Sequence, residues 1–269
     1  MLTSTANPRV KRIIKLNKKA AARTAEQVFV IEGIKLFMEA PEQLIKEVYI
    51  TQSIYTKYIS EQNFSDPQQE LVNAKLLRIN YEIVSDDVFA RMSDTQTPQG
   101  LLCVVRQRHF DLNGLPFAGN SLYLVLEDIQ DPGNLGTIFR TAEAAGVEAV
   151  IMSRGCADIY NPKTIRATMG SVFRVGFAYV DDLLFTLEAL KAQDIELYAA
   201  CLDNSEYYDK LDYRRGTAFL IGSEGHGLKE ETKKTAKNLK IPMGGQVESL
   251  NAATATAILL FEAARQRRT

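Results

Sequence analysis

The feature that most constrains the fold is a regular alternation of short apolar segments and helical patterns in the second half of the chain. Six strand-like runs occur there, at 122–126, 149–152, 174–180, 196–201, 218–221 and 239–241. Helical patterns fill most of the intervals, at 135–145, 162–169, 183–193 and after residue 251. Repeated β–α alternation implies a mostly parallel sheet covered by helices on both faces. We therefore predict an α/β fold with a mostly parallel sheet.

The first half is predicted to be a smaller α/β unit. Helices are expected at 8–24, 34–40 and 86–91, with Pro8 opening the first of them and Asn7 as a possible cap. Strands are expected at 27–31, 48–51, 77–79 and 100–105, and a polar excursion at 60–71. The apolar rhythm breaks between residues 106 and 120. We predict a first domain over 1–107, a linker over 108–120 and a second domain over 121–269.

Composition limits the class of protein. A chain of 269 residues with 46% hydrophobic and 24% charged residues fits a soluble globular protein of one or two domains. Cys103, Cys156 and Cys201 are odd in number and far apart, which indicates a reducing compartment without disulfides. With only His109 and His226 besides, no zinc pattern exists. No signal core or membrane-length apolar run is present, so we expect a cytoplasmic protein without a metal.

Charge is unevenly distributed although the net charge is −1. Residues 1–24 hold seven basic side chains and no acidic one, whereas 25–107 hold twelve acidic and seven basic. The seven are Arg9, Lys11, Arg12, Lys15, Lys18, Lys19 and Arg23. A short basic face on a balanced protein is typical of a nucleic-acid footprint, and a solvated amphipathic helix is the alternative.

Three polar loops follow predicted strands, and ligands of such sheets bind beyond the carboxyl ends of strands. The first, 127–134, contains the turn signal Asp-Pro-Gly-Asn, with Asn134 as a possible helix cap. Arg140 falls six residues later on a similar side of the helix start, where a cation opposes the helix dipole. Such a placement suits a phosphate or a developing oxyanion. An ion pair between Arg140 and Glu143 is the alternative.

The second loop, 222–228, has glycines at 222, 225 and 227. Their spacing is neither GxGxxG nor a P-loop, which disfavours NAD, FAD and ATP. Glu224 would repel a phosphate, but it can accept a hydrogen bond from a hydroxyl or ammonium group. A flexible turn is the alternative, and His226 is expected to be structural or exposed to solvent.

The third loop, 242–251, joins a strand to the long terminal helix. Gly244 and Gly245 permit close approach to a ligand or a positive φ. Ser249 and Asn251 are good N-cap residues for the helix. A strand, a polar loop and a buried helix entrance can hold a small molecule, and a well-capped helix is the alternative.

Together the loops resemble the three ordered motifs of the SpoU/TrmH branch of the SPOUT RNA methyltransferases. The matching segments are Asn134-x-Gly136-x-x-x-Arg140-x-Ala142, Ile221-Gly222-Ser223-Glu224-Gly225-x-Gly227-Leu228, and Ile241-Pro242-Met243 with Glu248-Ser249-Leu250-Asn251. The first half resembles the L30e-like substrate-binding domain often fused to them, through Asn7-Pro8 and Lys11, 29–33, and Ser93-Asp94 with Thr97-Pro98-Gln99-Gly100. The family often reads Ser-Leu-Asn-Val-Ser, so Ala253 here lacks one hydroxyl.

The resemblance implies a deep trefoil knot, an exception to the rule that chains avoid knots. It also implies a homodimer with the active site near the subunit interface, where the terminal helix packs, and S-adenosylmethionine bound bent in the knot. The implied cofactor-binding residues are Cys201, Gly222, Ser223, Gly225, Ile241, Met243, Leu250 and Ala252. The implied catalytic and substrate-site residues are Asn134, Arg140, Glu224, Ser249 and Asn251.

The implied reaction is methylation of a ribose 2′-oxygen in structured RNA, with 23S ribosomal RNA favoured. Transfer RNA, or an RNA-binding or ribosome-assembly factor without activity, is the alternative, and a nucleotide-dependent oxidoreductase is disfavoured. The family mechanism makes Arg140 the general base, but an arginine guanidinium strongly resists deprotonation in proteins. We expect it instead to bind phosphate and stabilise the alkoxide. The residues expected to bind RNA are Arg9, Lys11, Arg12, Lys15 and Lys18.

Overall fold

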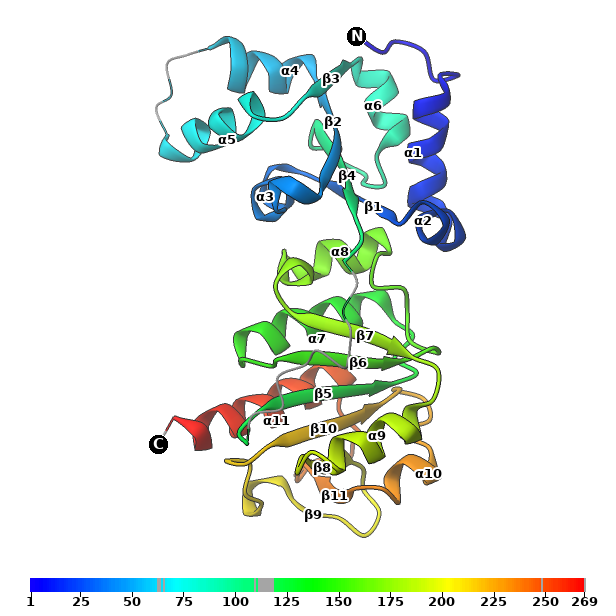
Figure 1. Cartoon of the computed structure of the whole chain (residues 1–269), viewed down its shortest axis with the longest axis vertical. Coiled ribbons are helices and arrows are strands. Elements are labelled where there is room, and N and C mark those ends of the chain that lie inside the picture. Colours follow the sequence, from blue (N-terminus) through cyan, green and yellow to red (C-terminus); the bar gives the residue numbers. More distant parts are fainter. Residues whose placement is uncertain (62–63, 65, 109, 111–118, 248, 269) are drawn as a thin grey trace. The chain divides into compact units, whose positions relative to one another are not determined.

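The computed structural model describes residues 1–61, 64, 66–108, 110, 119–247 and 249–268. It divides into two compact units (Figure 1). Unit 1 comprises Met1–Arg108 with Tyr160–Phe173, and unit 2 comprises His109–Ile159 with Arg174–Thr269. The predicted linker lies largely outside the described residues, as do His109 and Glu248, and the predicted domain boundaries stay a prediction.

Unit 1 contains a four-stranded sheet of order β1-β4-β2-β3. Its strands are β1 Val28–Glu32, β2 Ile45–Thr51, β3 Tyr81–Val84 and β4 Leu101–Arg106. Its helices are α1 Pro8–Lys18, α2 Ala20–Glu26, α3 Ile34–Glu39, α4 Gln52–Tyr55, α5 Pro67–Leu77, α6 Asp86–Met92 and α8 Pro162–Thr168. Strand β4 is antiparallel to β1 and β2, and β2 is parallel to β3. The predicted small α/β unit is confirmed.

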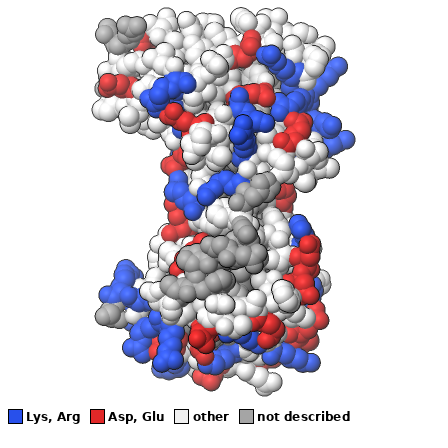
Figure 2. All heavy atoms as spheres, in the orientation of Figure 1, with Lys and Arg blue, Asp and Glu red and all other residues white. Residues whose placement is uncertain are grey.

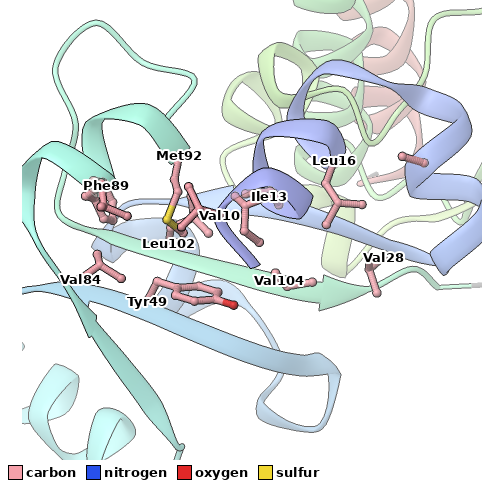
Figure 3. Close-up of a cluster of buried hydrophobic side chains, with 13 residues drawn as sticks. Val10, Ile13, Leu16, Val28, Tyr49, Val84, Phe89, Met92, Leu102 and Val104 are labelled. Carbon is pink, nitrogen blue, oxygen red and sulfur yellow. The ribbon is translucent and has the colours of Figure 1, made fainter. Parts of the chain in front are cut away.

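Helix α1 covers one face of this sheet. Val10, Ile13 and Leu16 recur every three residues and pack with Phe89 and Met92 of α6 over the strands (Figure 3). The side chain of Asn7 accepts a hydrogen bond of 2.9 Å from the Arg9 amide, which confirms the predicted cap.

The single helix predicted over 8–24 is wrong, because Lys19 is extended and divides it into α1 and α2. The guanidinium of Arg23 is buried and donates to the carbonyl oxygens of Leu16 at 2.6 Å and Asn17 at 3.2 Å. Arg23 therefore satisfies carbonyls at the end of α1 that helical hydrogen bonds leave open.

The strand predicted at 77–79 is also wrong, because α5 occupies much of the predicted polar excursion and runs to Leu77. Asp66 caps this helix and Pro67 opens it, a local signal that the apolar pattern obscured. The buried ammonium of Lys75 donates to the carbonyls of Phe37 at 2.7 Å and Ala40 at 2.6 Å, so α5 is tied to the end of α3. The sheet strand β3 begins four residues after α5 ends.

Unit 2 contains a seven-stranded sheet of order β7-β6-β5-β10-β8-β11-β9, in which all registered pairs are parallel. The strands are β5 Leu122–Glu127, β6 Ala149–Ser153, β7 Gly176–Val180, β8 Glu196–Ala200, β9 Glu206–Tyr207, β10 Thr217–Gly222 and β11 Lys237–Lys240. The helices are α7 Pro132–Ala144, α9 Leu183–Lys191, α10 Glu230–Lys233 and α11 Ala252–Arg267. The predicted parallel α/β fold is confirmed, while β9 and α10 were not predicted.

Helices cover both faces of the unit 2 sheet (Figure 1). Leu187 and Leu190 of α9 belong to a core cluster with Val125, Ala199 and Leu220 of the central strands. Helices α7 and α11 pack together, and α11 also packs on β10 (Figure 1). Every residue of β5 is buried, as expected for a central strand of such a sheet. The loops beyond the strand carboxyl ends are thus held by a rigid core.

Candidate functional site

A pocket of about 320 Å³ lies where β8, β10 and β11 end and α11 begins. Its volume falls at the lower end of the roughly 300–1,000 Å³ common for ligand sites. Seven of the eight predicted cofactor-binding residues line it, namely Cys201, Gly222, Ser223, Ile241, Met243, Leu250 and Ala252. Gly225 belongs to the same loop but does not line the pocket. The role of these residues in binding stays a prediction.

The sequence did not single out every residue that lines the pocket. Leu202 and Asp203 lie two and three residues after the end of β8, and Lys233 comes from α10. Leu202 and Asp203 could have been recognised from the sequence, because they follow a predicted parallel strand and ligands bind beyond the ends of such strands. Burial raises the pKa of the adjacent Cys201 thiol. The pocket therefore has charged groups along a largely apolar lining.

The turn at 222–228 is tight. A Cβ on Gly222 would lie 2.1 Å from the carbonyl carbon of Gly227, and Gly227 itself has a φ of +65°. The Gly227 amide donates to the carbonyl of Ser223 at 2.8 Å. Two of the three glycines are therefore required by the backbone, which favours a fixed turn over a flexible one.

Gly244 and Gly245 behave differently. Neither has a positive φ, so of the two possibilities for these glycines only close approach to a ligand is left, and it stays a prediction. A Cβ on either glycine would meet nothing within 4 Å, so open space lies beside this backbone. The side-chain oxygen of Asn251 accepts hydrogen bonds from the amides of Ala253 at 2.9 Å and Thr254 at 3.3 Å. The predicted N-cap is thus Asn251, whereas Ser249 lines the pocket.

Helix α7 begins earlier than predicted. Its N-cap is Asp131, whose Oδ1 accepts a hydrogen bond of 2.8 Å from the amide of Asn134, and Pro132 opens the helix. The prediction that Asn134 caps α7 is therefore wrong. Since Asp131 satisfies the helix start, the Asn134 side chain can contact the other two loops.

A chain of hydrogen bonds joins the three loops. The Nδ2 of Asn251 donates to Oδ1 of Asn134 at 3.0 Å, and Nδ2 of Asn134 donates to Oε1 of Glu224. Because Oδ1 of Asn251 is occupied by helix amides, its Nδ2 must face Asn134, and this fixes both amide orientations. Three of the five predicted catalytic residues thus converge beside the pocket.

Arg140 is exposed on α7. Its expected alternative partner, Glu143, instead pairs with Arg174, whose Nη2 lies 3.1 Å from Oε2 of Glu143. The alternative interpretation, an ion pair between Arg140 and Glu143, is therefore wrong. Within the described part of the chain, no hydrogen bond or ion pair to Arg140 was found, which leaves its guanidinium open to a ligand.

A buried carboxylate that the sequence did not single out supports the site. Glu127 ends β5, and its two oxygens accept hydrogen bonds of 2.9 Å each from the Lys229 amide and the Thr232 hydroxyl. The Lys229 ammonium lies 3.6 Å away. In the sequence, Glu127 could have been recognised because it is an acidic residue at the end of an otherwise apolar strand. Glu127 ties the strand that leads to α7 to the end of the glycine turn.

The predicted RNA-binding side chains differ in their surroundings. Lys11, Lys15 and Lys18 are exposed on α1, and Figure 2 shows basic side chains gathered over α1 and α2. Arg9 lies 3.3 Å from Glu82. Arg12 is partly buried and pairs with Glu26 at 2.6 Å and Glu47 at 2.7 Å, so it contributes to packing within unit 1.

The described residues show no sign of a metal site or a membrane-spanning helix. Among them, no cluster of three or more His, Cys, Asp or Glu side chains is arranged to hold a metal ion. No helix in this part of the chain is long and apolar enough to cross a membrane. His226 is exposed in the glycine turn, as expected.

Known proteins share both units. The profile of the SpoU rRNA methylase family matches residues 121–261, and that of the MRM3-like substrate binding domain matches 7–103. The 23S rRNA (guanosine(2553)-2'-O)-methyltransferase RlmP of Bacillus subtilis is 33% identical, covering 97% of each chain. The 23S rRNA (guanosine-2'-O-)-methyltransferase RlmB of Bordetella pertussis is 35% identical over 85% of this chain and 91% of its own.

A solved structure extends the similarity to three dimensions. The AdoMet-bound rRNA methyltransferase from Sinorhizobium meliloti superposes with a TM-score of 0.83 at 31% identity, covering 98% of this chain and 97% of its own. AdoMet is S-adenosylmethionine. The family profile, the relatives over nearly the whole chain and the shared fold agree. The chain therefore belongs to the SpoU rRNA methylase family.

Proposed function

We propose that this protein transfers the methyl group of S-adenosylmethionine to a ribose 2′-oxygen of 23S ribosomal RNA. The observation that carries the proposal is the Asn251–Asn134–Glu224 chain beside a pocket lined by the cofactor residues that the family motifs imply. Relatives named as 23S rRNA 2′-O-methyltransferases support the substrate. The cofactor supplies an electrophilic methyl group when it is bound.

The loops after β8, β10 and β11 would hold the cofactor. Apolar groups such as Ile221, Leu228 and Leu239 line the pocket and suit a flat aromatic base. Backbone groups around the Gly222–Gly227 close approach offer hydrogen bonds without intervening side chains. The residues present therefore fit a nucleoside-containing ligand.

Arg140 would bind a phosphate of the RNA and stabilise the negative charge that develops on the ribose oxygen. A planar guanidinium with five hydrogen-bond donors suits an oxyanion. The exposed lysines of α1 would hold RNA phosphates and orient the target.

We also propose a homodimer, the family's trefoil knot and a cytoplasmic location. The family resemblance implies that α11 packs against the partner subunit, and Phe261 on this helix is 46% exposed. Light scattering of the purified full chain tests the dimer.

Mapping 2′-O-methyl groups tests the function. The purified protein is incubated with S-adenosylmethionine and with unmodified 23S ribosomal RNA or bulk transfer RNA. We expect one new methylated ribose in 23S RNA. Methylation of transfer RNA alone would show that transfer RNA is the substrate in place of 23S RNA. Cofactor binding without methyl transfer to either RNA would favour an RNA-binding or ribosome-assembly factor.

A further inference from the structure

The proposed reaction leaves one group unassigned. The ribose hydroxyl must lose its proton as the new O–C bond forms, and a guanidinium cannot accept it. A side chain at the pocket that is able to bind a proton is the candidate acceptor. This inference rests on the proposed function.

Two carboxylates belong to the described lining of the pocket, those of Asp203 and Glu224. The side chain of Asp203 is 82% exposed, and its ion-pair contact is with Lys233 at 3.9 Å. Lys233 is also paired with Glu230 at 2.7 Å, so it is held as a cation. Glu224 alone of these residues is bonded to the Asn134–Asn251 chain.

The carboxylate of Glu224 is oriented on one side only. Asn134 donates to Oε1, which leaves Oε2 as an acceptor for a substrate hydroxyl. The donor is itself aimed by Asn251, which the first turn of α11 holds. The backbone beneath Glu224 is fixed by the Ser223–Gly227 hydrogen bond of 2.8 Å. Such prior orientation is what a proton acceptor in a positioned reaction requires.

We propose that Glu224 accepts the proton of the ribose 2′-hydroxyl during methyl transfer. The O–H bond breaks and its proton moves to Oε2 of Glu224. The ribose oxygen forms a bond to the methyl carbon as the carbon–sulfur bond breaks, and that electron pair stays on sulfur. S-adenosylhomocysteine leaves, and Glu224 returns the proton to water. Arg140 stabilises the oxygen while its charge develops.

The Glu224→Gln variant tests this step, because its amide oxygen still accepts from Asn134 but cannot take a proton. Single-turnover methylation is measured on an RNA fragment that the wild type methylates, and S-adenosylmethionine affinity is measured by titration. We expect a loss of about 10²–10⁴ in rate, the usual contribution of a general base, with unchanged cofactor affinity.

The same fragment carrying a 2′-thiol at the target ribose provides the decisive comparison. A thiol, with a pKa near 8.5 in cysteine, is largely ionised at pH 9 and needs no base. There we expect Glu224→Gln to approach the wild-type rate, while Arg140→Ala stays slow on both RNAs.

Three results would overturn the assignment. The first is a near-wild-type rate of hydroxyl methylation by Glu224→Gln, and the second is a rate of this variant that stays low on the thiol RNA. The third is a loss of S-adenosylmethionine affinity, which would make Glu224 a cofactor ligand. If the wild type methylates no RNA at all, the proposed function itself fails, and this outcome is distinct from the other three.

Discussion

The hydroxyl of Thr232 in α10 donates a hydrogen bond of 2.9 Å to Glu127 at the end of β5, and both residues are buried. The other Glu127 oxygen accepts from the backbone amide of Lys229, directly after the glycine turn. One carboxylate thus holds the turn that carries Glu224 against the strand that leads to Asn134. Loss of a hydrogen bond to Glu127 should therefore disturb the site, although neither Glu127 nor Thr232 lines the pocket.

Thr232→Val should weaken S-adenosylmethionine binding roughly tenfold, because an unsatisfied buried acceptor costs about 1–3 kcal/mol and the turn can shift. Thr232→Ser keeps the hydroxyl and should restore the affinity. Calorimetric titration at a temperature well below unfolding separates this effect from a loss of stability. Equal affinity in the valine and serine variants would show that the contact serves only stability.

Arg140→Ala should reduce methyl transfer at least 100-fold, the scale of removing one oxyanion-stabilising donor, with cofactor affinity retained. Arg140→Lys is less informative, since an amine can serve as a phosphate ligand or as a base. Glu143→Gln is the matched control on the same helix, because it breaks only the exposed pair with Arg174, which is worth about 0–1 kcal/mol. Near-wild-type turnover of Arg140→Ala would remove Arg140 from the mechanism.

Changing Lys11, Lys15 and Lys18 to Gln should weaken RNA binding and make it less sensitive to salt. Each lost phosphate contact lowers the slope of log affinity against log salt by about 0.7–0.9. Binding is measured by filter retention across salt concentrations, with cofactor affinity expected to stay constant.

Arg12→Gln is the control for these lysines. It should lower the free energy of unfolding, since Glu26 and Glu47 lose their common partner, while changing the salt slope little. An unchanged RNA affinity in the triple lysine variant would exclude α1 from the RNA interface.

Cys201 should report cofactor occupancy through its reaction with iodoacetamide. Burial raises the pKa of its thiol, and the thiolate is the reactive form, so labelling should increase at a higher pH than for a free cysteine, near 8.5. Cys103 and Cys156 are more buried and should react later. Saturating S-adenosylmethionine should slow labelling of Cys201, as followed by mass spectrometry. If S-adenosylmethionine leaves the labelling rate of Cys201 unchanged, the cofactor binds outside this pocket.

Local sequence patterns predicted most of the elements. The alternation of apolar strands with helices predicted the parallel sheet of unit 2, and Asn7 and Asn251 were recognised as caps because capping depends on neighbouring residues. The glycines at 222, 225 and 227 stand out by their spacing after an apolar strand, and the family motif adds a role for them. Two of the wrong predictions arose from competing local signals: Asp131 rather than Asn134 caps α7, and α5 extends into the predicted strand at 77–79.

Contacts between distant residues could be decided only by the tertiary structure. Asn134 and Glu224 are 90 residues apart, and Asn134 and Asn251 are 117 apart, so no periodicity predicts that their side chains form one chain of hydrogen bonds. Arg12 is a second example. The sequence predicts that it binds RNA, and only the tertiary structure shows its ion pairs with Glu26 and Glu47. The sequence alone determined which residue types lie at the ends of the strands. Packing of the parallel strands decided which of them meet, because it brings their carboxyl ends to one edge of the sheet.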